Sequence, residues 1–353
     1  MARTIFMLDL DAFFCSVEEI YDYRLKNIPF AIANVTENGL ISESHSIIST
    51  SNYEARKYGV KSAMHVYDAI KLCKNLKLVP ANMERYIDAS KRFLNLITTT
   101  YTNKYEQTSI DDYYLDVTEL LPMYHDNPLI LAAQIQDLVY KRLKLSVSIG
   151  ISNVKSLAKI ACDFNKPRGI TTLYPSEITT KLFNLSIDKI NGVGKKRIIQ
   201  FHNLGIRKVL DFYNYKDHKK LKSIFGAFYN HLMSLINVSI ENDDQVIDKY
   251  NESKQISRTH TYSLSSSDFD ELKIKLHNVI NELLDEVNFD EIKPKQITLK
   301  LRYEKHKITS KTKTLFDQST INNVNIYSYA LELFLDLWNE NPIKGIAISL
   351  GKL

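Results

Sequence analysis

The segment QTSIDDYYLDV, residues 107–117, places two adjacent aspartates inside a run that otherwise has the composition of a β-strand. Tyrosine, leucine and valine favour strands, whereas aspartate is depleted in them. Side chains on a strand alternate between its two faces, so Asp111 and Asp112 cannot both point at one site from a flat strand. A turn at 111–112 would let both carboxylates serve one cluster, and the sequence therefore predicts a turn there.

The elements around this segment predict a ferredoxin-like sheet. Residues 3–10 have the pattern of a buried strand, and DAFFCSVEEIYD then has helical spacing. After an insertion of short strands and helices come a long helix, the strand pair around the aspartates, a helix at 129–144 and the strand LSVSIGIS. This order is the split βαβ pattern of an α+β domain with helices on one face of the sheet.

The second half of the chain has a different organisation. After Pro175 the pattern is helical with short loops, and the acidic stretch 241–250 is typical of a linker. Beyond it, KQITLKLRY and HKITSKTKT are predicted strands that alternate with helices at 269–287 and 325–338. A length of 353 residues is too large for one ordinary core, so two to four domains are expected.

Composition excludes a membrane protein and favours a reduced compartment. No apolar run approaches the roughly 20 residues of a membrane span, and the first residues carry acids where a signal peptide would be apolar. The three cysteines are scattered without metal-binding or CxxC spacing. We therefore expect reduced thiols and a cytoplasmic protein.

Charge is unevenly distributed although the net value is only +5. Residues 241–248 hold four acids and no base. Residues 293–313 hold one acid, Glu304, and eight bases: Lys293, Lys295, Lys300, Arg302, Lys305, Lys307, Lys311 and Lys313. This contrast indicates separate modules, one of which presents a surface to a polyanion.

Asp9, in FMLDLDAFF, is the expected partner of the two aspartates, because its strand should lie beside the strand pair that carries them. Three converging carboxylates would repel each other unless a divalent cation neutralised them, and Mg²⁺ takes oxygen ligands of this kind. The alternative is that Asp111 and Asp112 are hairpin-turn residues, which aspartate favours. Asp11 is as well placed to cap the following helix and is not counted as a ligand.

Five motifs stand in the order and spacing found in the Y-family DNA polymerases. They are LDLDAFFCSVEE, STSNYEARKYGVKSAM, SIDDYYLDVT, SVSIGISNVKSLAKIACDFNKPRG and INGVGKKRIIQFHNLGI. The chain resembles the DinB type, DNA polymerase IV, well over residues 4 to about 212 and weakly over the last hundred. The resemblance implies template-directed, low-fidelity translesion synthesis in DNA repair and damage tolerance.

The resemblance also implies a right-hand polymerase architecture. Its palm would comprise 1–12 and 80–173 and its small fingers 13–79, followed by a helical thumb at 174–240 with a helix-hairpin-helix near 190–212. A linker at 241–250 would then join an α/β little finger at 251–353. The expected partners are primer–template DNA and deoxynucleoside triphosphates, and the expected form is a monomer.

Site residues follow from the matching motif positions. By resemblance, Asp9, Asp111 and Asp112 would be catalytic and would ligate two Mg²⁺ ions, for which Mn²⁺ can substitute. Phe14 would be the steric gate against a 2′-hydroxyl, with Phe13 beside it. The residues that would hold the triphosphate are Thr50, Tyr53, Arg56 and Lys166; Lys159 also matches the family pattern. Tyr53 and Arg56 suit this task because they are helical neighbours on one face.

Three features depart from the family pattern. The usual SIDE is SIDD here, which shortens Asp112 by one methylene, and Tyr113 replaces a small residue. Asn191 stands before Gly192-Val193-Gly194, where the family usually has proline. The glutamine-plus-hydrophobic tail that docks many members on the sliding clamp is not evident, although the clamp is still a candidate partner.

Two segments are expected to contact DNA. Gly192, Gly194 and Lys195 resemble a helix-hairpin-helix that binds a phosphate, although the same letters fit an ordinary helical turn. In the last domain, one face of the predicted sheet would carry Lys300, Arg302, Lys311 and Lys313, with Lys305 and Lys307. Such a cationic face suits a duplex backbone; a solvated sheet edge guarded by lysines is the alternative.

Two rival functions belong to other classes. A nucleotide cyclase also uses a palm-like sheet with metal-binding aspartates, but the GGDEF-type signature is absent from the sequence. A DNA-binding protein that has lost its catalytic function is the second rival, and the SIDD departure is its support. Primer extension with Mg²⁺ separates the polymerase from both.

Overall fold

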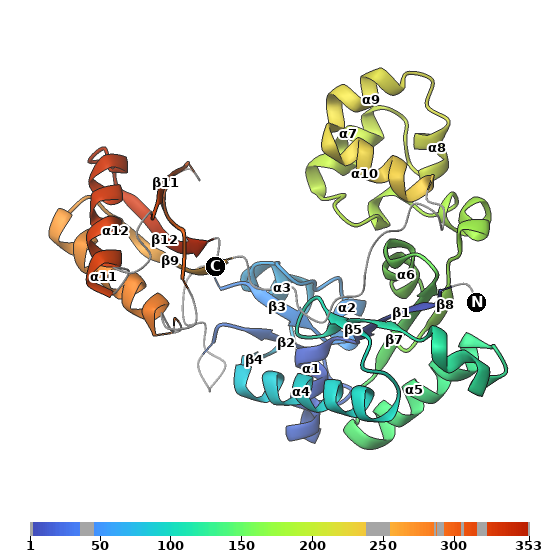
Figure 1. The fold of residues 1–353 in the computed structure, drawn as a ribbon. Helices are drawn as coiled ribbons and strands as arrows, with labels where there is room; N and C mark the ends of the chain where they lie inside the picture. The colour runs from blue at the N-terminus through green and yellow to red at the C-terminus, as the bar shows by residue number, and fades with distance from the viewer. Residues whose placement is uncertain are drawn as a thin grey trace. The chain divides into compact units, whose positions relative to one another are not determined.

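The computed structural model describes residues 3–35, 46–237, 255–285, 287, 293–304, 307–315 and 323–351 (Figure 1). The chain divides into two compact units, the first containing the described residues up to 237 and the second those from 255. The predicted linker at 241–250 lies outside the described residues, as does Lys305. No helix of the described ranges is long and apolar enough to span a membrane, and all three cysteines are buried free thiols.

The central sheet of the first unit has five strands in the order β5-β6-β1-β7-β8. Their bounds are β1 Ile5–Leu10, β5 Tyr105–Gln107, β6 Asp112–Asp116, β7 Val147–Ser152 and β8 Ile170–Thr172. β1 lies in the middle and pairs antiparallel with both β6 and β7, whereas β7 and β8 run parallel. This topology confirms the split βαβ prediction.

The alternation of side chains along β1 explains how the sheet is covered. Phe6, Leu8 and Leu10 point to one face and are buried with residues of three helices, α1 Phe13–Tyr21, α4 Met83–Thr100 and α5 Pro128–Leu143. Ile5 and Met7 point to the other face, where α6 Lys155–Cys162 packs. Figure 1 shows α4 and α5 on one side of the sheet and α6 on the other. Asp9 therefore extends from the α6 face.

A three-stranded sheet in the order β3-β2-β4 forms the insertion between β1 and α4. Its elements are β2 Phe30–Ala33, β3 Ile48–Ser51, α2 Tyr53–Lys57, α3 Val66–Leu72 and β4 Lys77–Pro80, preceded by a 3₁₀ turn at Tyr23–Leu25. Asn52 caps α2 by accepting a hydrogen bond from the Ala55 N–H at 2.9 Å. This cap fixes the start of the helix that carries Tyr53.

The segment after Pro175 is helical, as the sequence predicts. It contains α7 Lys195–Asn203, α8 Val209–Tyr213, α9 His218–Phe225 and α10 Ala227–Ile236. Short 3₁₀ turns occupy Pro175–Glu177 and Ile187–Lys189, a π-helical turn Ile178–Leu182, and a further 3₁₀ turn Thr118–Tyr124 precedes α5. The core of these helices is aromatic, with Phe201 stacked on Phe225 at 4.2 Å between ring centroids.

The second unit is a four-stranded antiparallel sheet in the order β11-β10-β12-β9, covered on one face by two helices. Its elements are β9 Gln255–Ser266, α11 Phe269–Leu284, β10 Gln296–Tyr303, β11 Ile308–Thr314, α12 Asn323–Leu337 and β12 Ile343–Gly351. The helices and the two strands β10 and β11 agree with the sequence prediction. β9 was not predicted, because its side chains are mostly polar and it lies at the sheet edge.

Gly150 sets how closely α6 approaches the sheet. A Cβ at this position of β7 would lie 2.0 Å from the carbonyl oxygen of Ala158 and 2.4 Å from the backbone nitrogen of Cys162. Backbone atoms cannot move aside to relieve such contacts, so α6 can pack this closely only because residue 150 has no side chain.

Gly150→Ala is therefore expected to force α6 away from β7 and to destabilise the protein by about 3 kcal/mol or more. Gly194→Ala is the matched control, because a Cβ there meets nothing within 4 Å. Its effect should stay within about 1 kcal/mol. Thermal unfolding of the two variants checks this, and equal melting temperatures would contradict the packing argument.

Candidate active site

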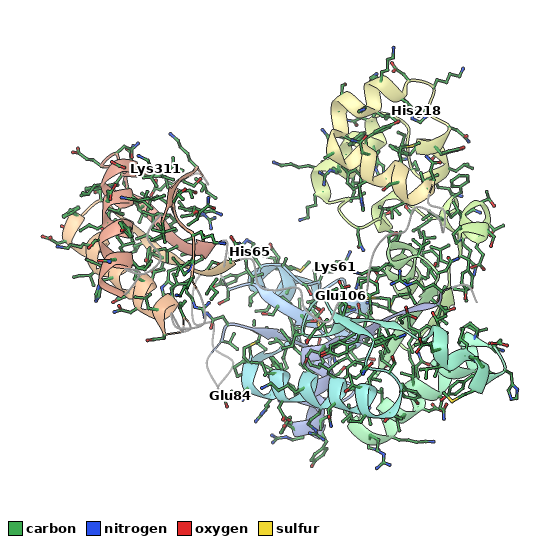
Figure 2. The ribbon with its side chains drawn as sticks, viewed as in Figure 1. Lys61, His65, Glu84, Glu106, His218 and Lys311 are labelled. Carbon is green, nitrogen blue, oxygen red and sulfur yellow. The ribbon has the colours of Figure 1, made fainter. Side chains whose placement is uncertain are left out.

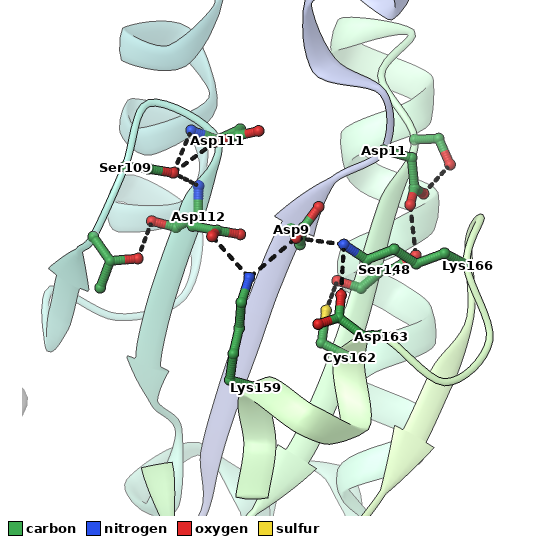
Figure 3. A network of polar contacts seen from close by, with 12 residues as sticks. Asp9, Asp11, Ser109, Asp111, Asp112, Ser148, Lys159, Cys162, Asp163 and Lys166 are labelled. Atoms are coloured by element: carbon green, nitrogen blue, oxygen red, sulfur yellow. Dashed lines mark hydrogen bonds and ion pairs between the residues drawn. The ribbon is translucent and has the colours of Figure 1, made fainter. Parts of the chain in front are cut away.

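Asp9 and Asp112 face each other at one end of the central sheet. They are paired residues in the antiparallel register of β1 and β6, so their side chains share a face. Their side chains are 14% and 20% exposed. Figure 3 shows the two carboxylates side by side above α6. The expectation that the strand of Asp9 lies beside the pair of aspartates is confirmed.

Two lysines from the α6 segment neutralise this pair. Lys159 Nζ donates to Asp9 Oδ2 at 3.2 Å and to Asp112 Oδ2 at 2.8 Å. Lys166 Nζ lies 2.5 Å from Asp9 Oδ2 and 3.0 Å from Asp163 Oδ1. Lys159 thus bridges the two strands, and Lys166 approaches from the opposite side of Asp9 (Figure 3).

The surroundings push the pKa values of the two carboxyls apart. Burial opposes ionisation of Asp9, but Lys166, the hydrogen bond with Asp112 and Lys159 together hold its pKa below the ordinary value. Burial and the negative charge of Asp9 raise the pKa of Asp112 to about 7, against the opposing effect of Lys159. The pair therefore carries a proton easily near neutral pH, as closely spaced carboxylates do.

Asp111 lies in the turn before β6 and points elsewhere. The Ser109 hydroxyl donates to Asp111 Oδ1 at 2.6 Å, and the Leu10 N–H donates to the Asp111 carbonyl at 3.0 Å. The chain bends at 109–111 and Asp112 already belongs to β6, so the turn comes earlier than the predicted 111–112 and does not direct both carboxylates to one point. Within the ranges that the structure describes, no three acidic, histidine or cysteine side chains gather closely enough to hold a metal ion. The structure therefore brings Asp9 and Asp112 together and leaves Asp111 beside them.

The donor set nevertheless suits a hard divalent cation. Asp112 Oδ1 is buried and has no hydrogen-bond partner, which is costly for a carboxylate oxygen. Asp9 and Asp111 both line one cleft next to it. Carboxylate oxygens are the ligands that Mg²⁺ prefers, and a bound cation would complete the coordination of this buried oxygen.

A cleft of about 280 Å³ opens beside the carboxylates. Its lining includes all six residues that the sequence assigns to the nucleotide: Phe13, Phe14, Thr50, Tyr53, Arg56 and Lys166. These residues come from α1, β3, α2 and the loop after α6. The structure therefore gathers into one cavity positions that are up to 153 residues apart in sequence (166 − 13).

The walls of the cleft are stiffened by aromatic and cationic contacts. Phe14 stacks on Tyr86 of α4 with 4.2 Å between ring centroids and 10° between planes. Tyr86 in turn donates to Glu18 at 2.9 Å. The Arg56 guanidinium lies 4.7 Å above the Tyr53 ring, so the predicted phenol–guanidinium face of α2 exists. Tyr86 was not singled out from the sequence, because nothing local distinguishes it from a core aromatic.

Asp11 does not cap α1. The residue at the cap position is Ala12, with φ 44°, and it makes no side-chain cap. Asp11 is 1% exposed and accepts hydrogen bonds instead from Tyr53, Ser146, Ser148 and Arg168. The backbone turns at Ala12, which directs this carboxylate into the protein rather than along the helix axis.

Tyr113 fills the space below the aspartate turn. It is 1% exposed on the face opposite Asp112, and its hydroxyl lies 2.5 Å from Ser90 Oγ of α4. The same hydroxyl lies 3.1 Å from the carbonyl oxygen of Ile110 and accepts from Gln107 at 3.1 Å. This departure from the family pattern therefore ties the turn to α4.

The glycine turn before α7 has the backbone that its sequence suggests. Gly192 has φ +88°, a conformation that other residues rarely adopt, and Gly194 occupies the N-cap of α7 with open space around it. Lys195 begins the helix. Arg197 is engaged internally, because its guanidinium donates to the Gly192 carbonyl at 2.6 Å and lies over Phe228.

The predicted cationic face of the second unit is wrong in part. Lys311 and Lys313 lie opposite Leu299 and Ile297 in the register of β10 and β11, and directly opposite residues share a face. Both lysines therefore lie on the face that the helices cover. Lys311 pairs with Asp336 of α12 at 2.7 Å, and Lys313 pairs with Glu332 of the same helix (Figure 2 labels Lys311).

Lys300 and Arg302 belong to the opposite face, because they alternate with the buried leucines of β10. Their cross-strand neighbours on β12 are Ala347 and Gly345. On the next strand, β9, Thr259 and Thr261 lie opposite these two residues. On the outer face of this sheet, Lys300 and Arg302 thus lie beside small residues of β12. Alternation along each strand was predictable, but the register that decides which faces coincide was not.

Comparisons with known proteins show which family this chain is similar to. The chain matches the impB/mucB/samB family over residues 8–163 and the C-terminal domain of the same family over 253–353. It is 32% identical to DNA polymerase IV of Ureaplasma parvum serovar 3, across 99% of this chain and 94% of that protein. It is also 32% identical to DNA polymerase IV of Oceanobacillus iheyensis, across 99% of this chain and 80% of that protein.

Solved structures give the same result over the full chain. A Y-family DNA polymerase chimera, Dbh-Dpo4(243-245)-Dbh, has a TM-score of 0.82 at 28% identity and covers 99% of both chains. An insertion ternary complex of Dbh DNA polymerase has a TM-score of 0.68 at 29% identity, again over 99% of both chains.

The raised pKa of Asp112 predicts how stability depends on pH without metal. The native protein holds the proton of this carboxyl up to about pH 7, whereas the unfolded chain releases it near 3.8. Between these values the native state binds more protons, so stability falls as pH rises. The Asp112→Asn variant has no carboxyl to titrate at this position, so it does not show this loss of stability at higher pH. The difference in melting temperature between Asp112→Asn and wild type should therefore shift by a few degrees in favour of the variant as the pH is raised from 5 to 8.

Calorimetry with a chelator present measures this difference. Asp88→Asn is the control, because Asp88 lies on the surface of α4 with its side chain 59% exposed. Its difference from wild type should not change with pH. A pH-independent difference for Asp112→Asn as well would show that the carboxyl titrates at its ordinary value.

Proposed function

Because this chain belongs to the impB/mucB/samB family of Y-family, DinB-type DNA polymerases, we propose that its sheet-end carboxylates and the adjoining cleft add deoxynucleotides to a primer 3′-hydroxyl. The chain is a low-fidelity, DNA-directed DNA polymerase of the translesion type. The observation that carries the residue assignment is the position of Asp9, which faces Asp112 and also lines the cleft of the six nucleotide residues.

The polymerases of this family depend on metal ions. We propose that Asp9, Asp111 and Asp112 would hold two Mg²⁺ ions, with Mn²⁺ as a substitute. Such ions would supply Lewis-acid activation of the primer hydroxyl and charge neutralisation at the triphosphate. The unpartnered Asp112 oxygen supports this assignment. Lys159 and Lys166 hold the carboxylates in place at short range before substrates arrive.

The cleft residues divide into two groups by chemistry. Thr50, Tyr53, Arg56 and Lys166 would bind the triphosphate, because two cations and the Thr50 hydroxyl line the same cleft, with the Tyr53 ring beneath the Arg56 guanidinium. Phe13 and Phe14 would lie at the sugar, with Phe14 as the gate against a 2′-hydroxyl. The stacking of Phe14 on Tyr86 supports the gate, since a braced ring cannot move aside easily. Positioning and charge neutralisation, rather than a protein base, would supply catalysis.

DNA would be bound through its backbone by two surfaces. The free N–H groups at the start of α7, with Gly192, Gly194 and Lys195, suit a phosphate of the duplex. Lys300 and Arg302, on the outer face of the second sheet, suit further phosphates. In this assignment the palm comprises 1–12 and 80–173, the fingers 13–79, the thumb 174–240 and the little finger 251–353.

The partners follow from the same assignment. The relatives include a ternary complex and a post-insertion binary complex of Dbh, which supports binding of primer–template DNA and deoxynucleoside triphosphates. We place the enzyme in the cytoplasm as a monomer, because one chain supplies all the residues of the cleft. A sliding clamp is the proposed partner for recruitment to DNA.

Primer extension tests the catalytic assignment. Wild-type protein with Mg²⁺ should extend a primer on a template, and Asp9→Asn should lose at least about 10²-fold in rate, because it removes a charge from the metal site. Asp88→Asn changes an exposed aspartate of α4 and should extend primers at the wild-type rate. Primer–template affinity should stay within a few-fold in both variants. Near-normal extension by Asp9→Asn would remove Asp9 from the site.

The two pairs of cations in the second unit make a matched test of DNA contact. Replacing Lys300 and Arg302 by alanine should flatten the dependence of log K on log salt by up to about 0.9 per lost phosphate contact. Replacing Lys311 and Lys313, which are paired with α12, should leave that slope nearly unchanged. Titration of a duplex at several salt concentrations measures both slopes. The reverse order would mean that the helix-covered face contacts DNA.

A further inference from the structure

Asp11 lies outside the proposed metal and nucleotide residues, yet its surroundings are unusually specific. The carboxylate is 1% exposed and accepts four hydrogen bonds. Oδ1 accepts from Ser148 Oγ at 2.7 Å and from Tyr53 Oη at 3.3 Å. Oδ2 accepts from Ser146 Oγ at 2.8 Å and from the Arg168 N–H at 2.8 Å. Because burial of an unpaired carboxylate is very costly, these four donors are what allow it to stay there.

The donors come from three separate segments. Ser146 directly precedes β7 of the central sheet and Ser148 belongs to that strand, whereas Tyr53 is the first residue of α2 in the insertion. Arg168 belongs to the loop that follows α6. One buried side chain therefore joins the central sheet to both segments that carry the proposed triphosphate residues.

The contact with Arg168 holds a strained backbone. Arg168 has φ 56°, a left-handed conformation that is unfavourable for a residue with a side chain. Lys166, two residues earlier, reaches the cleft and approaches Asp9 at 2.5 Å. The Asp11 bond to the Arg168 N–H therefore fixes the loop from which Lys166 enters the site.

The contact with Tyr53 directs a phenol. Its hydroxyl has a single proton, which it donates to Asp11, while the Arg56 guanidinium lies 4.7 Å above the ring. Both side chains line the cleft. The Asp11 carboxylate therefore determines the positions of the Tyr53 phenol and of the Arg56 guanidinium above it before a nucleotide binds.

We propose that Asp11 is a positioning residue for the incoming nucleotide, which holds Tyr53 and the Lys166 loop at the triphosphate wall of the cleft. This inference rests on the proposed polymerase function. It assigns Asp11 to nucleotide affinity and not to the chemical step, because its carboxylate points to these donors and away from the Asp9–Asp112 pair (Figure 3).

Asp11→Asn is the sharpest variant, since it keeps the shape and replaces one acceptor by an amide N–H₂. The Arg168 N–H cannot accept a hydrogen bond, so the amide N–H₂ is expected at the Oδ1 position, where the hydroxyls of Ser148 and Tyr53 must turn to accept from it. Single-turnover insertion of one nucleotide should show an apparent nucleotide Kd raised about 10-fold or more, with the maximal rate within a few-fold of wild type. Asp137→Asn is the control, because it breaks the exposed contact with the Arg168 guanidinium and leaves the Asp11 bonds intact.

Coupling to Tyr53 separates positioning from a general loss of structure. If Asp11 acts partly through the phenol, the effects of Asp11→Asn and Tyr53→Phe on nucleotide Kd should combine to less than their product. If the two substitutions acted independently, their fold-changes in nucleotide Kd would multiply. Should Asp11→Asn fail to fold, Ser146→Ala removes one of the four donors and should raise the nucleotide Kd by a smaller factor at an unchanged maximal rate.

The possible outcomes distinguish failure of this inference from failure of the proposed polymerase function. If wild-type protein extends no primer, the proposed function fails. If wild type is active while Asp11→Asn and Ser146→Ala both keep the wild-type nucleotide Kd, the positioning role alone is rejected. A lowered maximal rate with an unchanged Kd in the folded Asp11→Asn variant also rejects it, because that result would place Asp11 in the chemical step.

Discussion

Asp9 and Asp112 face each other across β1 and β6, at an end of the sheet that is largely closed to water. Such a pair is unfavourable by itself, because both carboxylates lose hydration and repel each other. Lys159 and Lys166 offset part of this cost, and the orphaned Asp112 oxygen leaves room for a cation to offset more. The charge balance at this sheet end therefore determines the stability and the proton affinity of the site, and would determine the metal affinity that we propose for it.

The rest of the fold keeps this charge cluster in place. The buried side of β1 packs on three helices, while Gly150 lets α6 approach the other side closely enough for Lys159 to reach both acids. The inserted sheet adds Tyr53 and Arg56, whose helix starts at a fixed cap. Most of the residues that we propose for nucleotide binding and catalysis thus belong to helices and strands, which suits a reaction that depends on positioning.

Two residues that depart from the family pattern, Asp112 and Tyr113, stand at the same turn. Asp112 is shorter than the usual glutamate, and Tyr113 replaces a small residue on the opposite face. The structure shows the tyrosine hydroxyl satisfied by Ser90, Gln107 and the Ile110 carbonyl, so the larger side chain is accommodated without an unpaired polar group. A turn tied to α4 in this way can hold a shorter acid at a defined place.

The sequence by itself determined the strand that carries Asp9 and the split order of the central sheet, because periodicity is a local property. Its resemblance to the family pointed to six of the residues that line the cleft. Tertiary structure decided which acids meet: Asp112 faces Asp9, whereas Asp111 turns to Ser109. It also placed Lys311 and Lys313 on the helix side and made Asp11 a buried acceptor. Strand register and backbone direction at a turn depend on distant partners, and a local pattern contains no information about them.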